Sequence, residues 1–196
     1  MPHLSKLRIP ALALGAAVLL GGCTPPAARS APLQPVPAGS AVRQVGDAEI
    51  AAIVVTANSI DVAAGRLALA RSQNPEVRRF AQTMITDHTA VNEAAAALVQ
   101  RLGVTPAESE ASRSLKQSAE ATDARLSALQ GSAFDRAYLD NEIAFHDAVI
   151  RTMDGTLIPA ATNPELKAAL VGARPAFQAH LEHARQARAG LQRSGQ

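Results

Sequence analysis

The sequence has few aromatic residues. It contains no Trp, one Tyr and four Phe, and Ala, Leu and Val supply most of the 47% of residues that are hydrophobic. Strand-rich folds draw on aromatic and β-branched side chains, whereas Ala and Leu favour helices. The composition therefore predicts an all-α fold, and 196 residues are enough for one domain with a sizeable core.

The chain also has little excess of charge. Lys6 and Arg8 lie in the first 22 residues, and without them the chain has 17 basic and 17 acidic residues. Proteins that bind the phosphates of nucleic acid need a basic surface. The sequence therefore predicts no nucleic-acid partner.

Motifs of several enzyme classes are missing as well. There is no Gly-rich phosphate loop, no Cys–His pair and no convincing Ser–His–Asp arrangement, and the serines lie mostly in caps and linkers. Hydrolase and kinase chemistry is therefore not indicated. No other motif names a reaction.

The single cysteine, Cys23, follows a short apolar segment. Residues 1–22 have a basic start, the apolar stretch Ile9–Leu20 and then two glycines, which is the three-part organisation of a signal peptide. The apolar run is shorter than the roughly 20 residues that span a bilayer. Its Leu-Gly-Gly-Cys ending resembles the bacterial lipobox, which implies that Cys23 carries a lipid and becomes the mature N-terminus. The alternative is an ordinary cleaved signal with an incidental cysteine.

Residues 23–46 are rich in Pro, Ala, Gly and Ser. Such a segment buries too little apolar area to order itself, so we expect a partly extended spacer behind the lipidated cysteine. The resemblance to lipoproteins associates Asp after the cysteine with the inner membrane, and here Thr24 follows it. We therefore expect a lipid anchor in the outer membrane facing the periplasm, with the inner membrane and the cell surface as alternatives.

Apolar residues recur at three- and four-residue steps in the rest of the chain, which predicts helices over about 47–72, 75–102, 109–129, 133–157 and 164–191, and a tail at 192–196. Asn74-Pro75-Glu76 and Asn163-Pro164-Glu165 each supply an N-cap, a first-turn proline and an acid near the positive end of the helix dipole. We expect residues 47–191 to form a four-helix bundle with one additional shorter helix.

Five ionisable residues occupy positions that should face this core: Asp61, His88, Glu142, His146 and His180. Burying such groups singly costs several kcal/mol unless they are paired, hydrogen-bonded or metal-bound, so we expect the fold to bring them together. Imidazole and carboxylate ligands suit iron, zinc, manganese or copper. The alternative is a metal-free network of hydrogen bonds. Asp87 and His183 lie beside the apolar seams and are weaker candidates.

Several of these residues belong to an ordered series: Asn74-Pro75-Glu76-Val77, Phe80-Ala81, Met84, Asp87-His88, Asn92, Phe134-Asp135, Tyr138, His146, Pro175, His180-Leu181 and Ala184. Over residues 47–191 the series resembles the bacterial domain of unknown function family 4142, whose members are predicted ferritin-like envelope proteins. The resemblance implies recurrent histidines at His88, His146 and His180, and an inward acid at Asp61, where the family more often has Glu.

The resemblance does not imply ferroxidase activity. Di-iron ferritins use paired Glu-x-x-His motifs, and in this chain Glu142 and His146 are one residue too far apart. Three functions remain open. The first is a metal-binding or redox-protective envelope bundle, and the second is a non-catalytic structural or stress-related lipoprotein with a buried polar network. The third is an enzyme whose substrate the sequence does not indicate.

Overall fold

The fold is known from a computed structural model, which describes residues 45–194, with side chains to residue 192. The predicted signal peptide, Cys23 and nearly all of the predicted spacer lie outside these residues. Localisation and lipid attachment therefore stay predictions.

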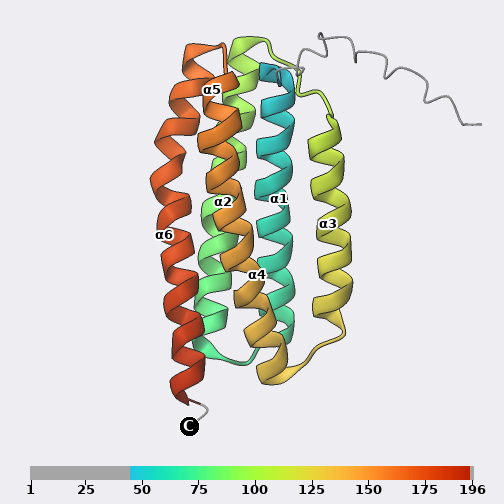
Figure 1. Cartoon of the computed structure of the whole chain (residues 1–196), viewed down its shortest axis with the longest axis vertical. Coiled ribbons are helices and arrows are strands. Elements are labelled where there is room, and N and C mark those ends of the chain that lie inside the picture. Colours follow the sequence, from blue (N-terminus) through green and yellow to red (C-terminus); the bar gives the residue numbers. More distant parts are fainter. Residues whose placement is uncertain (1–44, 195–196) are drawn as a thin grey trace, which may run out of the picture. The chain divides into compact units, whose positions relative to one another are not determined.

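The described chain is helical and contains no β-strand, so the all-α prediction is confirmed (Figure 1). Its elements are α1 (Asp47–Arg71), α2 (Pro75–Leu102), α3 (Glu110–Ser127), α4 (Gly131–Thr152), the π-helical turn η1 (Met153–Leu157), α5 (Ile158–Ala160) and α6 (Pro164–Ser194).

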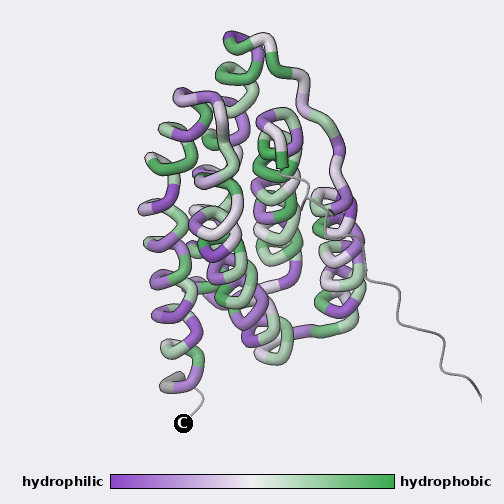
Figure 2. Tube along the Cα trace, turned by 45° about the horizontal axis from the view of Figure 1, so that its top comes forward, coloured by the Kyte–Doolittle hydropathy of each residue, from purple (hydrophilic) through white to green (hydrophobic). Residues whose placement is uncertain are grey.

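The long helices are arranged as two packed pairs, α1 with α2 and α4 with α6, and α3 lies beside α1 (Figure 1). Figure 2 shows hydrophobic and hydrophilic residues alternating along the turns of these helices, as expected when one face of each is buried. α1 is also long and apolar enough to cross a membrane by length and composition. A core helix meets the same criteria, and here Asn58 and Asp61 are buried on it.

The two predicted caps are present. The Asn74 side-chain oxygen accepts hydrogen bonds from the amides of Glu76 and Val77 at 2.9 and 3.3 Å. The Asn163 oxygen accepts from Glu165 and Leu166 at 2.9 and 3.2 Å. Each cap satisfies amides that lack a partner in the first turn of a helix, so α2 and α6 begin at the prolines that the sequence indicates.

The end of the fourth predicted helix is less regular than its apolar pattern indicates. The α-helix ends at Thr152, and residues Met153–Leu157 widen into a π-helical turn before the three-residue α5. Pro159 has no amide hydrogen to donate to the preceding turn, and Gly155 lowers the cost of an irregular backbone. The spacing of apolar residues alone does not reveal how the proline and the glycine change the backbone.

The buried apolar side chains form two separate cores. The first core comprises Ala64, Ala68, Val77, Phe80, Ala81, Met84, Leu126, Phe134, Tyr138, Leu139, Ala184 and Ala187. The second core comprises Ile50, Ile53, Leu98, Met153, Leu157, Ala161, Leu166, Leu170 and Phe177. Along α1, α2 and α6, and along α4 with its continuation η1, buried polar residues lie between the residues of one core and those of the other. The bundle therefore has a polar layer across its middle.

Gly65 allows α1 and α2 to approach closely. A Cβ atom at this position would lie 2.9 Å from the Ala81 carbonyl oxygen and 2.9 Å from Cγ1 of Ile85. One of these neighbours is backbone, so the clash cannot be relieved by a side-chain rotation alone.

We expect Gly65→Ala to lower the free energy of unfolding by about 1–3 kcal/mol, the usual cost of overpacking. Gly172→Ala is the matched control, because a Cβ there meets nothing within 4 Å. Replacing glycine in an open helical position stabilises by about 0.5–1 kcal/mol. Urea denaturation of both variants measures the difference, and equal stabilities would show that Gly65 is not needed for packing.

Candidate metal centre

The polar layer consists of six side chains from four helices: Asn58 and Asp61 of α1, His88 of α2, Glu142 and His146 of α4, and His180 of α6. Five of them are at most 1% exposed, and His180 is 6% exposed. Every residue of the predicted metal site therefore lies in one buried layer. Their metal-binding role stays a prediction.

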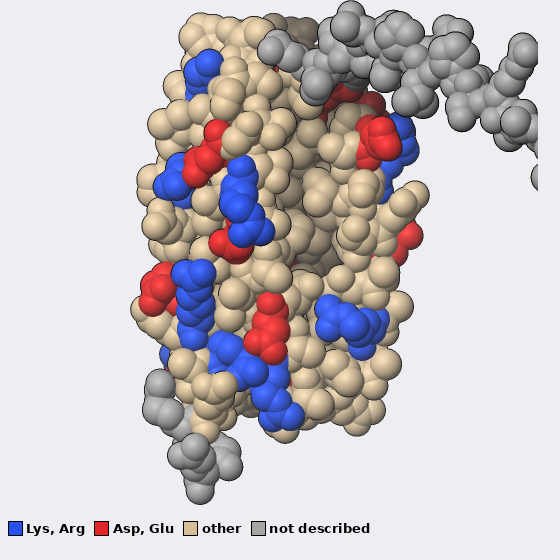
Figure 3. Space-filling view, viewed as in Figure 1, with Lys and Arg blue, Asp and Glu red and all other residues tan. Residues whose placement is uncertain are grey.

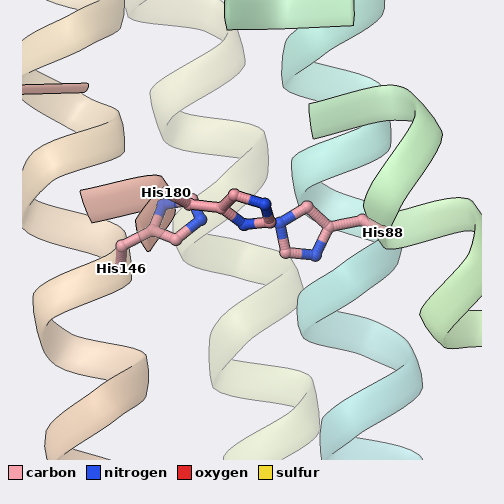
Figure 4. A group of neighbouring side chains, drawn as sticks. All are labelled: His88, His146 and His180. Carbon is pink, nitrogen blue, oxygen red and sulfur yellow. The ribbon is translucent and has the colours of Figure 1, made fainter. Parts of the chain in front are cut away.

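The three imidazole rings meet between α2, α4 and α6 (Figure 4). Their centroids are 5.1 Å apart for His88 and His180, 5.5 Å for His88 and His146, and 5.6 Å for His146 and His180. One ring nitrogen from each histidine lies within 4.8 Å of the other two. Two nitrogens that bind one ion at about 2.1 Å can be no more than about 4.2 Å apart, so small ring movements suffice for a shared ion.

Hydrogen bonds to neighbouring residues fix which nitrogen of each ring is free. Nδ1 of His88 lies 2.7 Å from the side-chain oxygen of Asn58, whose amide nitrogen donates to the Val54 carbonyl at 2.8 Å. Because that oxygen can only accept, Nδ1 of His88 is the donor. Nε2 of His88 is left with a lone pair.

The other two histidines are held in the same way. Nδ1 of His146 donates to the backbone oxygen of Glu142 at 3.0 Å, which leaves Nε2 free. Nε2 of His180 donates to Oδ2 of Asp87 at 2.8 Å, which leaves Nδ1 free. Metal-binding histidines in proteins commonly donate their second N–H to a carboxylate or carbonyl, which orients the ring.

Burial keeps two of these histidines neutral. It lowers the pKa of His88 to about 3, helped by the neighbouring imidazoles of His146 and His180. It also lowers the pKa of His146 to about 4, although the hydrogen bond to Glu142 opposes the shift. Both rings are therefore unprotonated at neutral pH, which is the form that binds metal.

The two carboxyl groups of the layer share a buried environment. Burial and the adjacent Glu142 raise the pKa of Asp61 well above its usual value, and burial raises the pKa of Glu142 to about 8. The two groups are within hydrogen-bonding reach of each other. Without a cation nearby, the pair therefore retains a proton at neutral pH. One carboxyl oxygen of Asp61 and one of Glu142 lie within 4.8 Å of a ring nitrogen of His146.

Each of the five predicted site residues has one buried polar atom without a hydrogen-bond partner among the described residues. These atoms are Oδ2 of Asp61, Nε2 of His88, Oε2 of Glu142, Nε2 of His146 and Nδ1 of His180. A buried polar atom left unpaired costs about 1–3 kcal/mol, so native proteins leave few of them. Five in one layer fit a bound ion, because every one of these atoms has a lone pair to offer.

Two aromatic residues border the layer. The Phe177 ring lies 5.2 Å from His88 and 6.1 Å from His146, measured between centroids, and so covers the imidazoles on the side of the second core. Tyr138 belongs to the first core, and its buried hydroxyl has no hydrogen-bond partner among the described residues. Burial and the charges of Glu142 and Asp61 raise its pKa well above the usual value. The hydroxyl therefore stays protonated and can donate.

Of the two residues that orient the histidines, sequence reasoning missed Asn58 and named Asp87 only as a weaker candidate. Asn58 could have been noticed, because it lies three residues before Asp61 on the same face of an apolar helix. Asp87 was rated a weaker candidate and is about half exposed, but its carboxylate holds His180. The other weak candidate, His183, packs edge-on against Phe80 and is not among the three clustered histidines of the layer.

Comparison with known proteins agrees with the resemblance seen in the sequence. The family model described as a domain of unknown function, DUF4142, matches residues 31–187. No curated protein and no solved structure gives a significant match, so a ferritin-like fold stays a prediction. Because the match covers most of the chain, this protein belongs to the domain of unknown function 4142 family.

Proposed function

We propose that this protein binds one divalent transition-metal ion in the polar layer. His88, His146 and His180 supply nitrogen ligands, and Asp61 and Glu142 supply oxygen ligands and negative charge. This ligand set suits iron, zinc, manganese or copper. When bound, the ion supplies a Lewis-acidic or redox-active centre inside the bundle, sheltered from solvent by the two cores.

The five unpaired buried atoms are the observation that carries this proposal. They come from four helices, and the three histidines among them have their other ring nitrogen already engaged in a hydrogen bond. Random burial of polar residues would not bring one ring nitrogen from each of the three histidines within 4.8 Å of the other two. A positive ion would satisfy these lone pairs and replace the proton of the carboxyl pair at once.

A self-contained polar network is the competing explanation. It fits the contacts of the histidines with Asn58 and Asp87, each of which accepts a hydrogen bond from an imidazole. It fits Asp61 and Glu142 less well, because His88 lies 3.6 Å from the Asp61 carboxylate and His146 lies 3.6 Å from the Glu142 carboxylate. That separation is too long for a hydrogen bond.

The site's cellular setting follows from the N-terminal segment. The signal-like residues 1–22 and the lipobox-like ending at Cys23 support an exported protein anchored by lipid, with the bundle in the periplasm. Its only predicted partner is then the membrane that holds the lipid. Labelling with a radioactive or alkyne-tagged fatty acid, beside Cys23→Ser, tests this part separately from metal binding.

Metal content tests the main proposal. Protein isolated from cells that express the full chain, without a chelator or a histidine tag, is expected to contain close to one equivalent of a transition metal by mass spectrometry. The double variant His88→Gln, His180→Gln is expected to contain almost none. Glutamine keeps the layer polar and of similar volume, so the fold should survive the change.

His183→Gln is the matched control, because it removes a histidine of α6 that lies outside the layer. We expect its metal content to equal that of the unmodified protein. The proposal fails if none of the proteins retains metal after incubation with iron, zinc, manganese and copper in turn, or if the double variant and the control retain the same amount.

A further inference from the structure

A large apolar cavity occupies the half of the bundle that contains the second core. Its volume is about 520 Å³, and α1, α2, α3, α4, η1 and α6 all contribute to its wall. Phe177 and Asn58 lie at the border between this cavity and the polar layer, since both line the cavity and contact His88. Binding pockets for small molecules typically have volumes of about 300–1,000 Å³.

The cavity exists because the side chains around it are small and because α3, which lies beside α1, does not fill the second core. Val91 and Ala95 continue the inward seam of α2 but are only partly buried, and they line the cavity. α3 covers the opening with its small residues Ala111, Ser114 and Ser118, and among its own residues only Ser112 and Leu126 are buried. Figure 3 shows the surface hollowed between α4 and α3.

The wall has the chemistry of a hydrocarbon site. Among the described residues, no Lys, Arg, Asp, Glu or His lines the cavity, and its few polar side chains are Asn58, Ser114, Ser118, Thr152 and Thr156. Asn58 already uses its side chain for hydrogen bonds to Val54 and His88. An ionised group inside would therefore be desolvated without a partner, which is costly. Apolar cavities also hold water poorly.

The wall is long in the direction of the helices. Its lining residues on α6 run from Leu166 to Phe177, and those on α2 run from Val91 to Val99. At 1.5 Å per residue these stretches are roughly 16 Å and 12 Å long. A volume of about 520 Å³ spread over a length of roughly 16 Å leaves a cross-section of roughly 30 Å², so the space is elongated and narrow. This shape fits a chain better than a fused-ring molecule.

We propose that the cavity binds a linear hydrocarbon chain, either of a free fatty acid or of a membrane phospholipid. The chain lies along the helices with one end toward Phe177, and the polar head remains in solvent at the exposed edge, where the hydroxyl groups of Ser114, Ser118 and Thr152 are located. Binding requires no metal, so this inference and the proposed metal site can fail independently.

A fluorescent fatty acid, cis-parinaric acid, tests the proposal on the metal-free full chain. We expect a saturable rise in fluorescence. The double variant Ala95→Phe, Ala173→Phe places two rings in the cavity and should weaken binding by about tenfold or more, because the apolar contact area is no longer available. Ala97→Phe, Ala176→Phe is the matched control, since these exposed alanines of the same helices do not line the cavity.

The control also accounts for binding elsewhere on the chain, because such binding would be equal in the two double variants. Circular dichroism checks that each variant folds, and the smaller change Ala95→Leu serves if the double variant does not. Displacement of the probe by palmitate supports a free fatty acid, and displacement by phosphatidylglycerol vesicles supports a phospholipid. Displacement by neither, or equal probe affinity in the filled and control variants, would overturn the proposal.

Discussion

Addition of the preferred metal to metal-free protein should raise its free energy of unfolding by about 4 kcal/mol when the free ion is at a thousand times its Kd. The proposed ligands come from α1, α2, α4 and α6, so a bound ion would link four helices that unfolding must separate. For a domain of this size the shift corresponds to a melting temperature roughly 10 °C higher. Differential scanning calorimetry with and without the ion measures it.

The double variant His88→Gln, His180→Gln should melt at the same temperature with and without the ion. His183→Gln should show the full increase, because its ring lies in the first core region against Phe80. An increase of equal size in the double variant would place the stabilising ion somewhere other than the polar layer. No increase in any of the three proteins would mean that the unpaired atoms of the layer do not bind metal.

The helices and the inward positions of the site residues were predictable because both depend on local spacing. Residues three and four apart share a face of a helix, so Asp61, His88, Glu142, His146 and His180 could be assigned to the core from the seams that contain them. The two Asn-Pro-Glu caps fixed the starts of α2 and α6 for the same reason.

What local spacing could not predict depends on contacts between helices. Asp87 is half-exposed on α2, and only the packing of α6 brings His180 to within 2.8 Å of it. The free nitrogen of each ring likewise follows from partners on neighbouring turns or helices. Val91 and Ala95 continue the apolar seam of α2, yet they line a cavity. The reason is that α3 packs on α1 and does not fill the space next to these two residues.

Metal-free protein should lose stability as the pH rises from about 6.5 to 8. Burial raises the pKa of Glu142 from 4.5 to about 8, and the pKa of Asp61 is raised as well. A carboxyl group with a raised folded pKa contributes its full stability below its unfolded pKa and loses it as the pH rises through the folded value. A difference of one bound proton between the folded and the unfolded chain over this pH interval changes the free energy of unfolding by about 2 kcal/mol.

The histidines act in the opposite direction and in a different interval. The folded pKa values of His88 and His146 are lowered to about 3 and about 4, so their contribution is complete above about 6.5 and is lost as the pH falls. Between about pH 4.5 and 6.5 the histidines and the carboxyl groups change the stability in opposite directions. Above about pH 6.5 only the carboxyl groups change it. We therefore expect maximal stability of the metal-free protein at mildly acidic pH.

Urea denaturation of chelator-treated protein at a series of pH values measures this profile. The double variant Asp61→Asn, Glu142→Gln cannot ionise at either position, so its stability should stay nearly constant between pH 6.5 and 8. Glu120→Gln, Asp123→Asn removes two exposed carboxyl groups of α3 and should leave the decline in place. Bound metal should also abolish the decline, because the ion replaces the proton that the pair otherwise loses. A decline that persists in the Asp61, Glu142 variant would mean that another group controls it, and that the carboxyl pair is already ionised at neutral pH.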